Sequence, residues 1–400
     1  MRSLRGYDCE EPMKIVLSYG LGADSTAILL RWLTEPETRG FSLDDLIVIT
    51  AQTGDEHVDT AILVEQHIYP LLAEHRIRTV QVARGGRYER DGIVVLDDTR
   101  EPILCLTSGG PYTLADEMEQ NATVPQSGNR AHSIKFKGWV IDQWIAANLG
   151  TDEPFVHVMG YEADELDRIQ GDSDKGLPNR LPTYPLLSWS WDRDACEAFI
   201  LSVLGVRWAK SCCVRCPFGY AQGSRDRTVL RLQRNPHQAV GALVMEYLAV
   251  AVNPRQGLLA GKQLYHLLAS TPGSQDLLAM FEDRLDELPW AIYEVRRAFS
   301  AKRGDAMARG TTRRSLRRLV TGTRAEMVAE IARAAHLLGR RLDSDGRHYR
   351  VWARERNLLF PCVEQALVAA PALAHDKTHP TFDKAWQAGL LGPRQLALAL

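Results

Sequence analysis

The residues best suited to chemistry form a short loop between two apolar runs. In VLSYGLGADSTAILL, residues 16–30, the first run ends at glycines and the second opens with an acid and two hydroxyls. Glycines let the backbone turn tightly and expose its N–H groups, and the start of the following helix is positive. Hydroxyls add donors, and a carboxylate can hold a cation, so the loop is predicted to bind phosphate beside a metal ion. The residues of this predicted phosphate loop are Ser18, Tyr19, Gly20, Gly22, Asp24, Ser25 and Thr26.

The loop does not fit two common phosphate motifs. A Walker loop needs Gly-Lys-Ser/Thr, and a dinucleotide fingerprint needs a third glycine where Ala23 and Asp24 stand. The alternative is a plain strand–turn–helix in which Asp24 caps the helix.

A second group of reactive residues is the cysteine cluster in SCCVRCP, formed by Cys212, Cys213 and Cys216. The chain has seven cysteines, an odd number, and reducing conditions keep cytoplasmic thiols free. The spacing therefore indicates a metal, a cluster or redox chemistry rather than a disulfide framework. The alternative is that one or two of these cysteines are small buried hydrophobic side chains.

Basic residues concentrate in one block of the chain. Residues 296–356 hold 17 Lys/Arg and 6 Asp/Glu, a balance of +11, so the remainder of the chain sums to −13. Most of these basic residues are arginines, which can grip phosphate with two hydrogen bonds. The block predicts contact with a polyanion such as nucleic acid, and a solvated helical face is the alternative.

The first 220 residues alternate β-branched runs with helical patterns. KIVLSYG, LIVITA, RTVQVA and PFVHVMG are typical of buried parallel strands. Between them, DSTAILLRWL, HVDTAILVEQHIYPLLAEH and KGWVIDQWIAANLG have apolar residues at helical spacing. This alternation predicts an α/β fold with a doubly wound, mostly parallel, Rossmann-like sheet.

Beyond residue 223 the strand signals fade, and the pattern predicts a mainly helical region. SQDLLAMFEDRLDELPWAIYEVRRAF is interpreted as one such helix. Later, TRAEMVAEIARAAHLLGRR predicts a helix, DSDG a turn and RHYRVWA a strand. The expected domains are 1–222, which binds nucleotide, 223–303, which is helical, and 304–400, which is basic and binds nucleic acid.

The overall composition is that of an ordinary soluble protein. Of the 400 residues, 45% are hydrophobic and 24% charged, and no apolar run is long enough to cross a membrane. The first residues, MRSLRGYDCEEPMK, lack the apolar core of a signal peptide. A cytoplasmic location is therefore expected.

The loop and four further stretches, in the same order, resemble the PP-loop ATP pyrophosphatase superfamily, and within it the branch related to phosphoadenosine phosphosulfate (PAPS) reductase. The resemblance covers roughly the first half of the chain. YPLLSWSWDRDACEAFI and KSCCVRCPF are similar to the closing Pro-Leu-x-x-Trp and Ser-x-Cys-x-x-Cys-Pro stretches. The other matching residues are Thr53, Gly54 and Glu56 in AQTGDEHVDT, Arg130, Ser133 and Lys137 in NRAHSIKFK, and Gly160, Glu165, Arg168 and Ile169 in GYEADELDRI.

The resemblance implies an adenine nucleotide α-hydrolase type of sheet, with the nucleotide across the carboxyl ends of its strands. The rule for open α/β sheets predicts the same location. Thr53, Gly54, Glu56 and Gly160 would then join the phosphate loop in binding nucleotide.

The resemblance also implies catalytic roles for Asp24, Lys137, Glu165 and Arg168. Lys137 and Arg168 would face phosphate or a developing negative charge. Surface cations are the alternative for both. Glu165 would pair with Arg168 or bind Mg²⁺, and the sequence leaves both open.

Two departures from the family pattern favour ATP cleavage over sulfonucleotide reduction. The reductase tail Glu-Cys-Gly-x-His is missing, and the last cysteine, Cys362, lies in LFPCVEQ. Reductases also tend to lose the loop aspartate, whereas Asp24 is present. The resemblance therefore implies cleavage of ATP, with Mg²⁺, to AMP and pyrophosphate.

Some relatives that sulfurate nucleic acids carry similar cysteines, together with one in the Arg-x-Cys-Ser stretch. At that position this sequence has His132. His132, Cys212, Cys213 and Cys216 are therefore a candidate ligand set for a 4Fe–4S cluster or Zn²⁺. The alternative is that Cys213 and Cys216 form a redox or persulfide-carrying pair.

The leading hypothesis is an ATP-dependent adenylating enzyme that installs sulfur on nucleic acid or a nucleotide-like substrate. Its expected partners are an adenine nucleotide, nucleic acid bound through 296–356, and a sulfur-donor protein. One alternative is a thiol-dependent reductase of the PAPS reductase type. Another is a nucleotide-sensing, nucleic-acid-binding subunit with little turnover.

Overall fold

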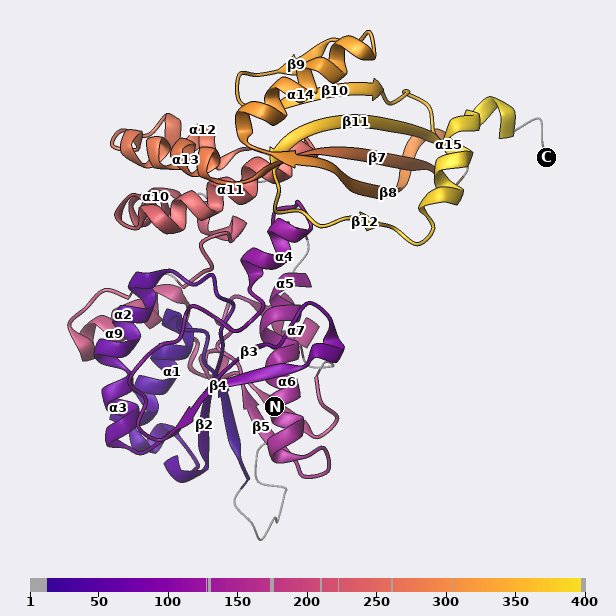
Figure 1. Cartoon of the computed structure of the whole chain (residues 1–400). Helices are drawn as coiled ribbons and strands as arrows, with labels where there is room; N and C mark the ends of the chain where they lie inside the picture. The colour runs from indigo at the N-terminus through magenta and orange to yellow at the C-terminus, as the bar shows by residue number, and fades with distance from the viewer. Residues whose placement is uncertain are drawn as a thin grey trace. The chain divides into compact units, whose positions relative to one another are not determined.

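The computed structural model describes residues 13–126, 128, 131–172, 176–208, 211–221, 223–259, 262–303 and 305–396. Two residues singled out in the sequence, Cys9 and Arg130, lie outside these ranges. The chain divides into two units, one of residues 1–115 and 127–221, the other of residues 116–126 and 222–400 (Figure 1).

The first unit is built on a six-stranded sheet in the order β4-β3-β2-β1-β5-β6. The pairs β1–β2, β2–β3, β1–β5 and β5–β6 are parallel, and only the edge strand β4 pairs antiparallel, with β3. The α/β class and the mostly parallel sheet predicted from the sequence are confirmed. The strands are β1 (Ile15–Ser18), β2 (Leu46–Ala51), β3 (Arg78–Arg84), β4 (Ile93–Thr99), β5 (Phe155–Val158) and β6 (Arg180–Thr183).

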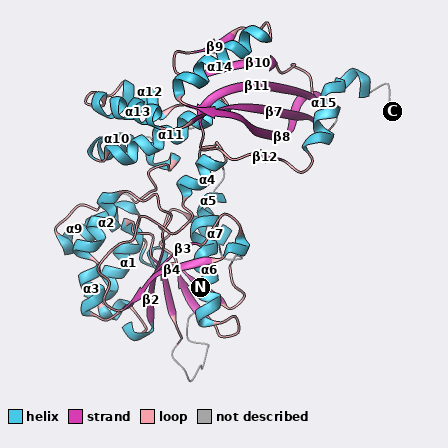
Figure 2. Cartoon of the chain, viewed as in Figure 1, coloured by secondary structure: helices cyan, strands magenta, loops and turns pink. Residues whose placement is uncertain are grey.

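Helices cover both faces of this sheet because alternate strand residues point to opposite sides. Ile15 and Leu17 of β1 pack with α1, α2, α3 and α9, whereas Val16 packs with α6 on the other face. Figure 2 shows the strands between these helix layers. The helices are α1 (Ala23–Thr34), α2 (Val58–His67), α3 (Tyr69–Glu74), α5 (Ala131–Ser133), α6 (Trp139–Leu149), α7 (Leu166–Asp172), α8 (Pro185–Trp189) and α9 (Arg193–Leu204).

The strand order reverses at β1, whose two neighbours are β2 and β5. Open α/β sheets generally bind their ligands outside the carboxyl ends of the strands at such a reversal of strand order. The predicted phosphate loop leaves β1 at this point, and Gly160 follows β5. The fold thus brings together residues that lie about 140 positions apart in the sequence.

The second unit corrects the expectation of a mainly helical C-terminal region. It contains a six-stranded antiparallel sheet in the order β12-β8-β7-β11-β10-β9. β7 and β8 are neighbours in this sheet and lie on either side of the expected boundary at residue 303/304. The strands are β7 (Trp290–Lys302), β8 (Asp305–Gly322), β9 (Leu342–Ser344), β10 (Tyr349–Arg354), β11 (Cys362–Pro371) and β12 (Lys377–Thr378).

The wrong helix prediction has a local cause. The stretch SQDLLAMFEDRLDELPWAIYEVRRAF contains helix α13 (Gln275–Glu287) followed by strand β7, with Pro289 between them. Proline removes a backbone donor and disfavours helix in the residue before it, so the helix ends there. The expected helix TRAEMVAEIARAAHLLGRR and the expected strand RHYRVWA are confirmed as α14 (Arg324–Leu337) and β10.

Helices pack on both faces of the second sheet. Phe382 and Trp386 of α15 (Phe382–Leu396) pack on Ala298 and Val363. Arg297, the residue before Ala298 in β7, points to the other face and donates to the carbonyl oxygen of Val252, at the end of α11. The remaining helices of this unit are α4 (Leu114–Gln120), most of which belongs to it, α10 (Arg225–Arg234), α11 (Pro236–Val252) and α12 (Leu264–Ala269).

Among the described residues, no helix is both long enough and apolar enough to cross a lipid bilayer.

A buried ion pair is predicted to be essential for the second unit. Arg297 Nη1 lies 2.7 Å from Glu364 Oε1, and both side chains are buried. Glu364→Ala leaves the guanidinium uncompensated and is expected to lower the free energy of unfolding by about 3–5 kcal/mol, measured by urea denaturation. Glu330→Ala, which removes an exposed partner of Arg333, is the control and should change it by no more than about 1 kcal/mol.

The double variant Arg297→Met/Glu364→Leu should recover most of the lost stability, because apolar residues often replace a buried ion pair without loss. A Glu364→Ala protein as stable as the Glu330→Ala control would contradict a buried, mutually dependent pair.

Candidate functional site

The predicted phosphate loop runs from the end of β1 into α1 and is held by its own backbone and hydroxyls. Gly20 N–H donates to Ser25 Oγ at 3.2 Å, and Thr26 N–H donates to the Gly22 carbonyl oxygen at 3.1 Å. Gly22 occupies the N-cap position, where it supplies no capping side chain. The first-turn N–H groups of α1 therefore offer the positive end of a helix to an anion.

Leu21, in the middle of the loop, has a left-handed backbone conformation with φ of 60°. This conformation is unfavourable for a leucine, and surrounding structure must hold it. Trp208 does so, because its indole N–H donates to the Leu21 carbonyl oxygen at 3.0 Å, and the Leu21 side chain is buried. The loop is therefore fixed from outside as well as by its own glycines.

Tyr19 and Thr26 have a supporting position rather than an exposed one. Their hydroxyl oxygens lie 3.1 Å apart, and both side chains are buried. The Thr50 hydroxyl also donates to the Tyr19 carbonyl oxygen at 3.1 Å. Of the predicted loop residues, these two stabilise the turn from beneath.

Two glycines are required by close packing around the loop. A Cβ atom on Gly160 would lie 3.0 Å from Ser25 N and 3.3 Å from Asp24 Cβ, so the β5 turn rests directly on the helix start. A Cβ atom on Gly22 would lie 2.5 Å from Ser211 Oγ, in the segment that carries the cysteines. The structure thus brings the loop, Gly160 and the cysteine segment to the same edge of the sheet.

Asp24 is the most strongly perturbed carboxyl group at this edge. Its Oδ2 lies 3.0 Å from Nη2 of Arg193, and the same nitrogen lies 2.5 Å from Glu162 Oε1. Its other oxygen, Oδ1, is buried and has no hydrogen-bond partner among the described residues. Burial raises the pKa of Asp24 to about 7, although Arg193 opposes the shift, and Glu162 and Glu165 add to it. An incoming cation would satisfy the orphaned oxygen.

A buried chain of hydrogen bonds ends at Ser18. Arg180 Nε donates to Nδ1 of His157 at 2.7 Å, so the hydrogen of this imidazole is on Nε2, 2.8 Å from Ser18 Oγ. Arg180 also donates to Asp172 at 2.6 Å, and Tyr184 donates to the same oxygen at 2.9 Å. Burial and the Arg180 charge lower the pKa of His157 to about 3, so the ring stays neutral. Because Ser18 Oγ accepts from His157, the Ser18 hydroxyl hydrogen remains to donate to another acceptor.

The two charged residues predicted after Gly160 pair with each other. Arg168 Nη1 lies 2.5 Å from Glu165 Oε1, and the Arg168 guanidinium lies 4.3 Å from the centre of the Tyr161 ring. Of the two alternatives left open by the sequence for Glu165, the structure has the ion pair with Arg168.

The turn after β2 holds the cysteine segment. Glu56 forms a β-bridge with Cys213, and Asp55 accepts from the backbone N–H of Arg215 at 3.1 Å and forms a buried ion pair with its guanidinium. Thr53 Oγ1 lies 3.4 Å from Cys213 Sγ. Gly54, between Thr53 and Asp55, has a φ of 73°, a backbone conformation that suits only glycine well.

Lys137 contacts this turn, and its side chain remains 33% exposed. Its Nζ lies 3.0 Å from Glu56 Oε1. Burial lowers the pKa of Lys137, but Glu56 and the nearby thiols raise it more, so the net shift is upward. Burial and the Glu56 charge raise the pKa of the Cys213 thiol well above its usual range, and burial raises that of Cys216. Both thiols are therefore protonated at neutral pH in this arrangement.

The four expected metal ligands come from two separate parts of the chain. Cys212, Cys213 and Cys216 lie in one turn, with Cys216 N–H donating to the Cys213 carbonyl oxygen at 2.9 Å, and His132 lies in α5. In the part of the chain that is described, no group of three or more His, Cys, Asp or Glu side chains could hold a metal ion. The cysteines described here are all free thiols.

Sequence reasoning missed Arg193, Glu162 and His157. Arg193 and Glu162 lie in WDRDACEAF and GYEADELDRI, two stretches already matched to the family, but nothing in their spacing predicted that both would contact Asp24. His157 lies inside an apolar strand, and the polarity of that one position was the available signal.

Comparison of the chain with models of known protein families finds no match, and comparison with curated proteins finds none either.

We predict that Gly160→Ala disturbs the loop. The new Cβ must displace Ser25 N or Asp24, so binding of a non-hydrolysable ATP analogue should weaken roughly tenfold, or about 1.4 kcal/mol, by calorimetry. Gly138→Ala is the matched control, since a Cβ there meets nothing within 4 Å. Equal binding by the two variants would contradict the close contact between Gly160 and the loop.

The chain of hydrogen bonds through His157 makes a second prediction. His157→Phe leaves a buried Arg180 donor without its acceptor and should lower the free energy of unfolding by about 1–3 kcal/mol. His157→Gln, which can still donate and accept, should retain more stability.

The pH dependence of this histidine has a definite sign. Because its folded pKa is about 3 and an unfolded histidine titrates near 6.5, the His157 contribution to stability is complete above pH 6.5 and declines as the pH falls toward 3. His157→Gln should therefore lose less stability than wild type between pH 7 and pH 5 in urea unfolding. Identical pH dependence of the two proteins would contradict a neutral, buried His157.

Proposed function

We propose that this protein cleaves ATP to AMP and pyrophosphate, and that it uses the adenylate to install sulfur on a nucleic acid or a nucleotide-like substrate. The single observation that carries the proposal is Asp24. Its half-buried carboxylate lies at the start of α1, beside a glycine turn and a strand-order reversal, and its Oδ1 atom has no hydrogen-bond partner among the described residues.

The surroundings of Asp24 suit the triphosphate of a nucleotide. The N-terminus of α1 and the Ser18 hydroxyl provide donors, and Gly22 and Gly160 allow a close approach of backbone. The strand order reverses at β1, and open α/β sheets bind ligands at the carboxyl ends of the strands beside such a reversal. Arg193 and Arg168 add positive charge near the same edge.

Asp24 would hold the magnesium ion that accompanies ATP. The orphaned Oδ1 is the oxygen ligand that such a hard cation prefers. The ion would neutralise phosphate charge as pyrophosphate leaves. Arg193 now neutralises the same carboxylate, so cation binding requires Asp24 to exchange this partner or share it.

The proposed reaction has two balanced steps. In the first, a substrate oxygen attacks the α-phosphorus of ATP, the bond from that phosphorus to the bridging oxygen breaks, and pyrophosphate leaves. In the second, hydrosulfide attacks the activated carbon, the carbon–oxygen bond breaks, and AMP leaves with the substrate oxygen. Where a donor protein's persulfide supplies the terminal sulfur instead, a second thiol of that donor then attacks the donor cysteine's sulfur, which releases the product thiol and leaves a disulfide on the donor.

The state of the thiols weighs against a reductase of the PAPS reductase type. Such chemistry needs a thiolate nucleophile, whereas burial beside Glu56 keeps Cys213 protonated. The Cys213–Cys216 turn lies close to the predicted phosphate loop, because a Cβ atom on Gly22 would meet Ser211 Oγ. Neither a 4Fe–4S cluster nor Zn²⁺ takes part in the proposed reaction.

The test of the proposal is release of AMP and pyrophosphate from ATP and Mg²⁺, in the presence of candidate nucleic acids and sulfide. Asp24→Asn should reduce the rate by about 10²-fold or more, the usual loss when an electrostatic stabiliser is removed. Asp44→Asn, at an exposed acid outside the site, should stay within about twofold of wild type. Absence of AMP from wild type with every acceptor, or equal rates for the two variants, would overturn the proposal.

Asp24→Asn should also stabilise the protein at alkaline pH. Because folding raises the pKa of Asp24 from about 3.8 to about 7, wild type loses unfolding free energy as the pH rises from 4 to 7. One pKa unit corresponds to about 1.4 kcal/mol, so the variant should gain roughly 1–3 kcal/mol over wild type at pH 8. Urea unfolding at pH 5 and pH 8 measures this gain, and a variant less stable than wild type at pH 8 would contradict the buried charge.

A further inference from the structure

The structure separates the basic residues of 296–356 into those used inside the second unit and those left at its surface. Arg350 is buried and donates to the carbonyl oxygens of Val250 and Ala251. Arg314 donates to the carbonyl oxygens of Asn121 and Ala122. Guanidinium groups committed in this way position the fold and do not face a partner.

Other arginines of the block are neutralised by acids of the same unit. Arg297 pairs with Glu364, Arg324 with Glu282 and Asp286. Arg347 stacks on Tyr265, with the guanidinium 3.2 Å from the ring centre, and lies 3.8 Å from Glu282. The net charge of residues 296–356 therefore overstates the positive charge that is available to bind a polyanion.

Four basic residues remain together at one end of the sheet, and we name them the basic sheet end: Lys302, Arg303, Arg309 and Arg356. Lys302 and Arg303 stand where β7 meets β8, and Arg309 pairs across the hairpin with Ala301. The Arg356 guanidinium lies 5.4 Å from the centre of the Phe299 ring, in the same end of β7. Lys302, Arg303 and Arg309 are exposed, and within the described residues none of the four forms an ion pair.

The next arginine along β8 does not extend the basic sheet end. Arg313, four residues beyond Arg309, donates to the hydroxyls of Thr381 and Ser300, which carry no charge. The register shift between Phe299 and Ala301 places Arg309, opposite Ala301, on the Phe299 face of the sheet, whereas Arg313, opposite Ala298, lies on the face covered by α15. Arg309 and Arg313 therefore lie on opposite faces and do not form one row.

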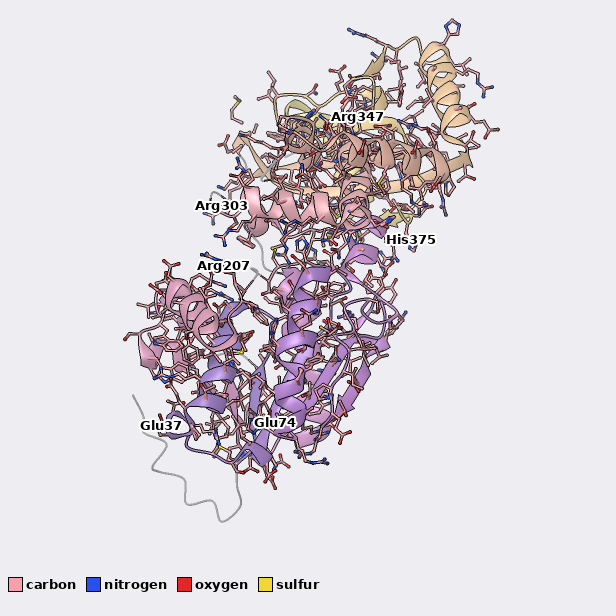
Figure 3. The ribbon with its side chains drawn as sticks, turned by 90° about the vertical axis from the view of Figure 1, so that its left-hand side faces the viewer. Glu37, Glu74, Arg207, Arg303, Arg347 and His375 are labelled. Atoms are coloured by element: carbon pink, nitrogen blue, oxygen red, sulfur yellow. The ribbon has the colours of Figure 1, made fainter. Side chains whose placement is uncertain are left out.

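Arginines at the opposite end of the sheet provide a comparison. Arg340 and Arg341 follow α14 and precede β9, which pairs with the first residues of β10. In the sheet, Tyr349 of β10 pairs with Ala369 of β11, and Ala369 pairs with Ile292 of β7. Ile292 lies near the start of β7, about ten residues from Lys302 at its other end. Figure 3 labels Arg303 at the basic sheet end and Arg347, two residues before β10, at a separate place in this unit.

We infer that the basic sheet end binds the phosphate backbone of nucleic acid, and that the arginines of 296–356 that are buried or paired inside the unit contribute little to this contact. The inference rests on the proposed function, in which nucleic acid is the sulfur acceptor, but it identifies the surface that the function leaves unspecified. Guanidinium groups without internal partners can each grip a phosphate with two hydrogen bonds. Base sequence is not read here, because backbone contacts carry no sequence information.

The test compares two triple variants that remove the same charge. Lys302→Gln/Arg303→Gln/Arg309→Gln changes the basic sheet end, and Arg333→Gln/Arg340→Gln/Arg341→Gln changes α14 and the turn after it. Both are titrated against fluorescein-labelled 30-nucleotide single-stranded DNA, duplex DNA and hairpin RNA from 50 to 300 mM NaCl. Anionic phosphatidylserine vesicles are tested in parallel.

The sheet-end variant should bind at least tenfold more weakly than wild type. Its slope of log affinity against log salt should be smaller by about 2 to 3, because each lost phosphate contact removes about 0.7 to 0.9. The control variant should stay within about twofold of wild type. Equal losses in both variants, no nucleic-acid binding by wild type, or an effect confined to vesicles would each overturn the inference.

The outcome is independent of ATP cleavage. Failure of the proposed function would appear as absence of AMP with intact nucleic-acid binding. Failure of this inference would appear as unchanged nucleic-acid affinity in the sheet-end variant, whether or not ATP is cleaved. Circular dichroism and thermal unfolding of both triple variants confirm that the second unit is folded.

Discussion

The interaction on which the site of the first unit depends is the pairing of the half-buried Asp24 carboxylate with Arg193 at the start of α1. A charge withdrawn from water is unfavourable unless it is paired, and Arg193 and Glu162 form the surrounding network. The Oδ1 atom of Asp24 has no hydrogen-bond partner among the described residues. The glycine turn, the reversal of strand order and the contact from Gly160 all converge on this group.

A second carboxylate near the loop, Glu56, also has more than one partner. Glu56 is shared between Lys137 and the Cys213 segment, so the turn after β2 and the cysteine turn form one buried unit. Burial, and then the negative charge of Glu56, raise the pKa of the Cys213 thiol and keep it protonated, while the Lys137 charge opposes this shift.

The second unit separates structural from available charge. Arg297 and Arg350 reach across from the sheet to the end of α11, where carbonyl oxygens and Glu364 receive them. These long arginine side chains connect the sheet to the end of helix α11. At the end of the β7–β8 hairpin, Lys302, Arg303 and Arg309 are exposed and form no ion pair within the described residues.

The sequence by itself determined the parallel sheet, its first strands and the glycine loop, because each rests on local patterns of apolar residues and glycines. It also indicated Asp24 before any contact was known. It misjudged β7 and β8, since a helix and a strand adjoin at Pro289 and the arginines of β8 hide its alternation. Only the tertiary structure decided that Arg193 neutralises Asp24 and which arginines remain free, because pairing between residues far apart in sequence depends on three-dimensional placement that no local pattern encodes.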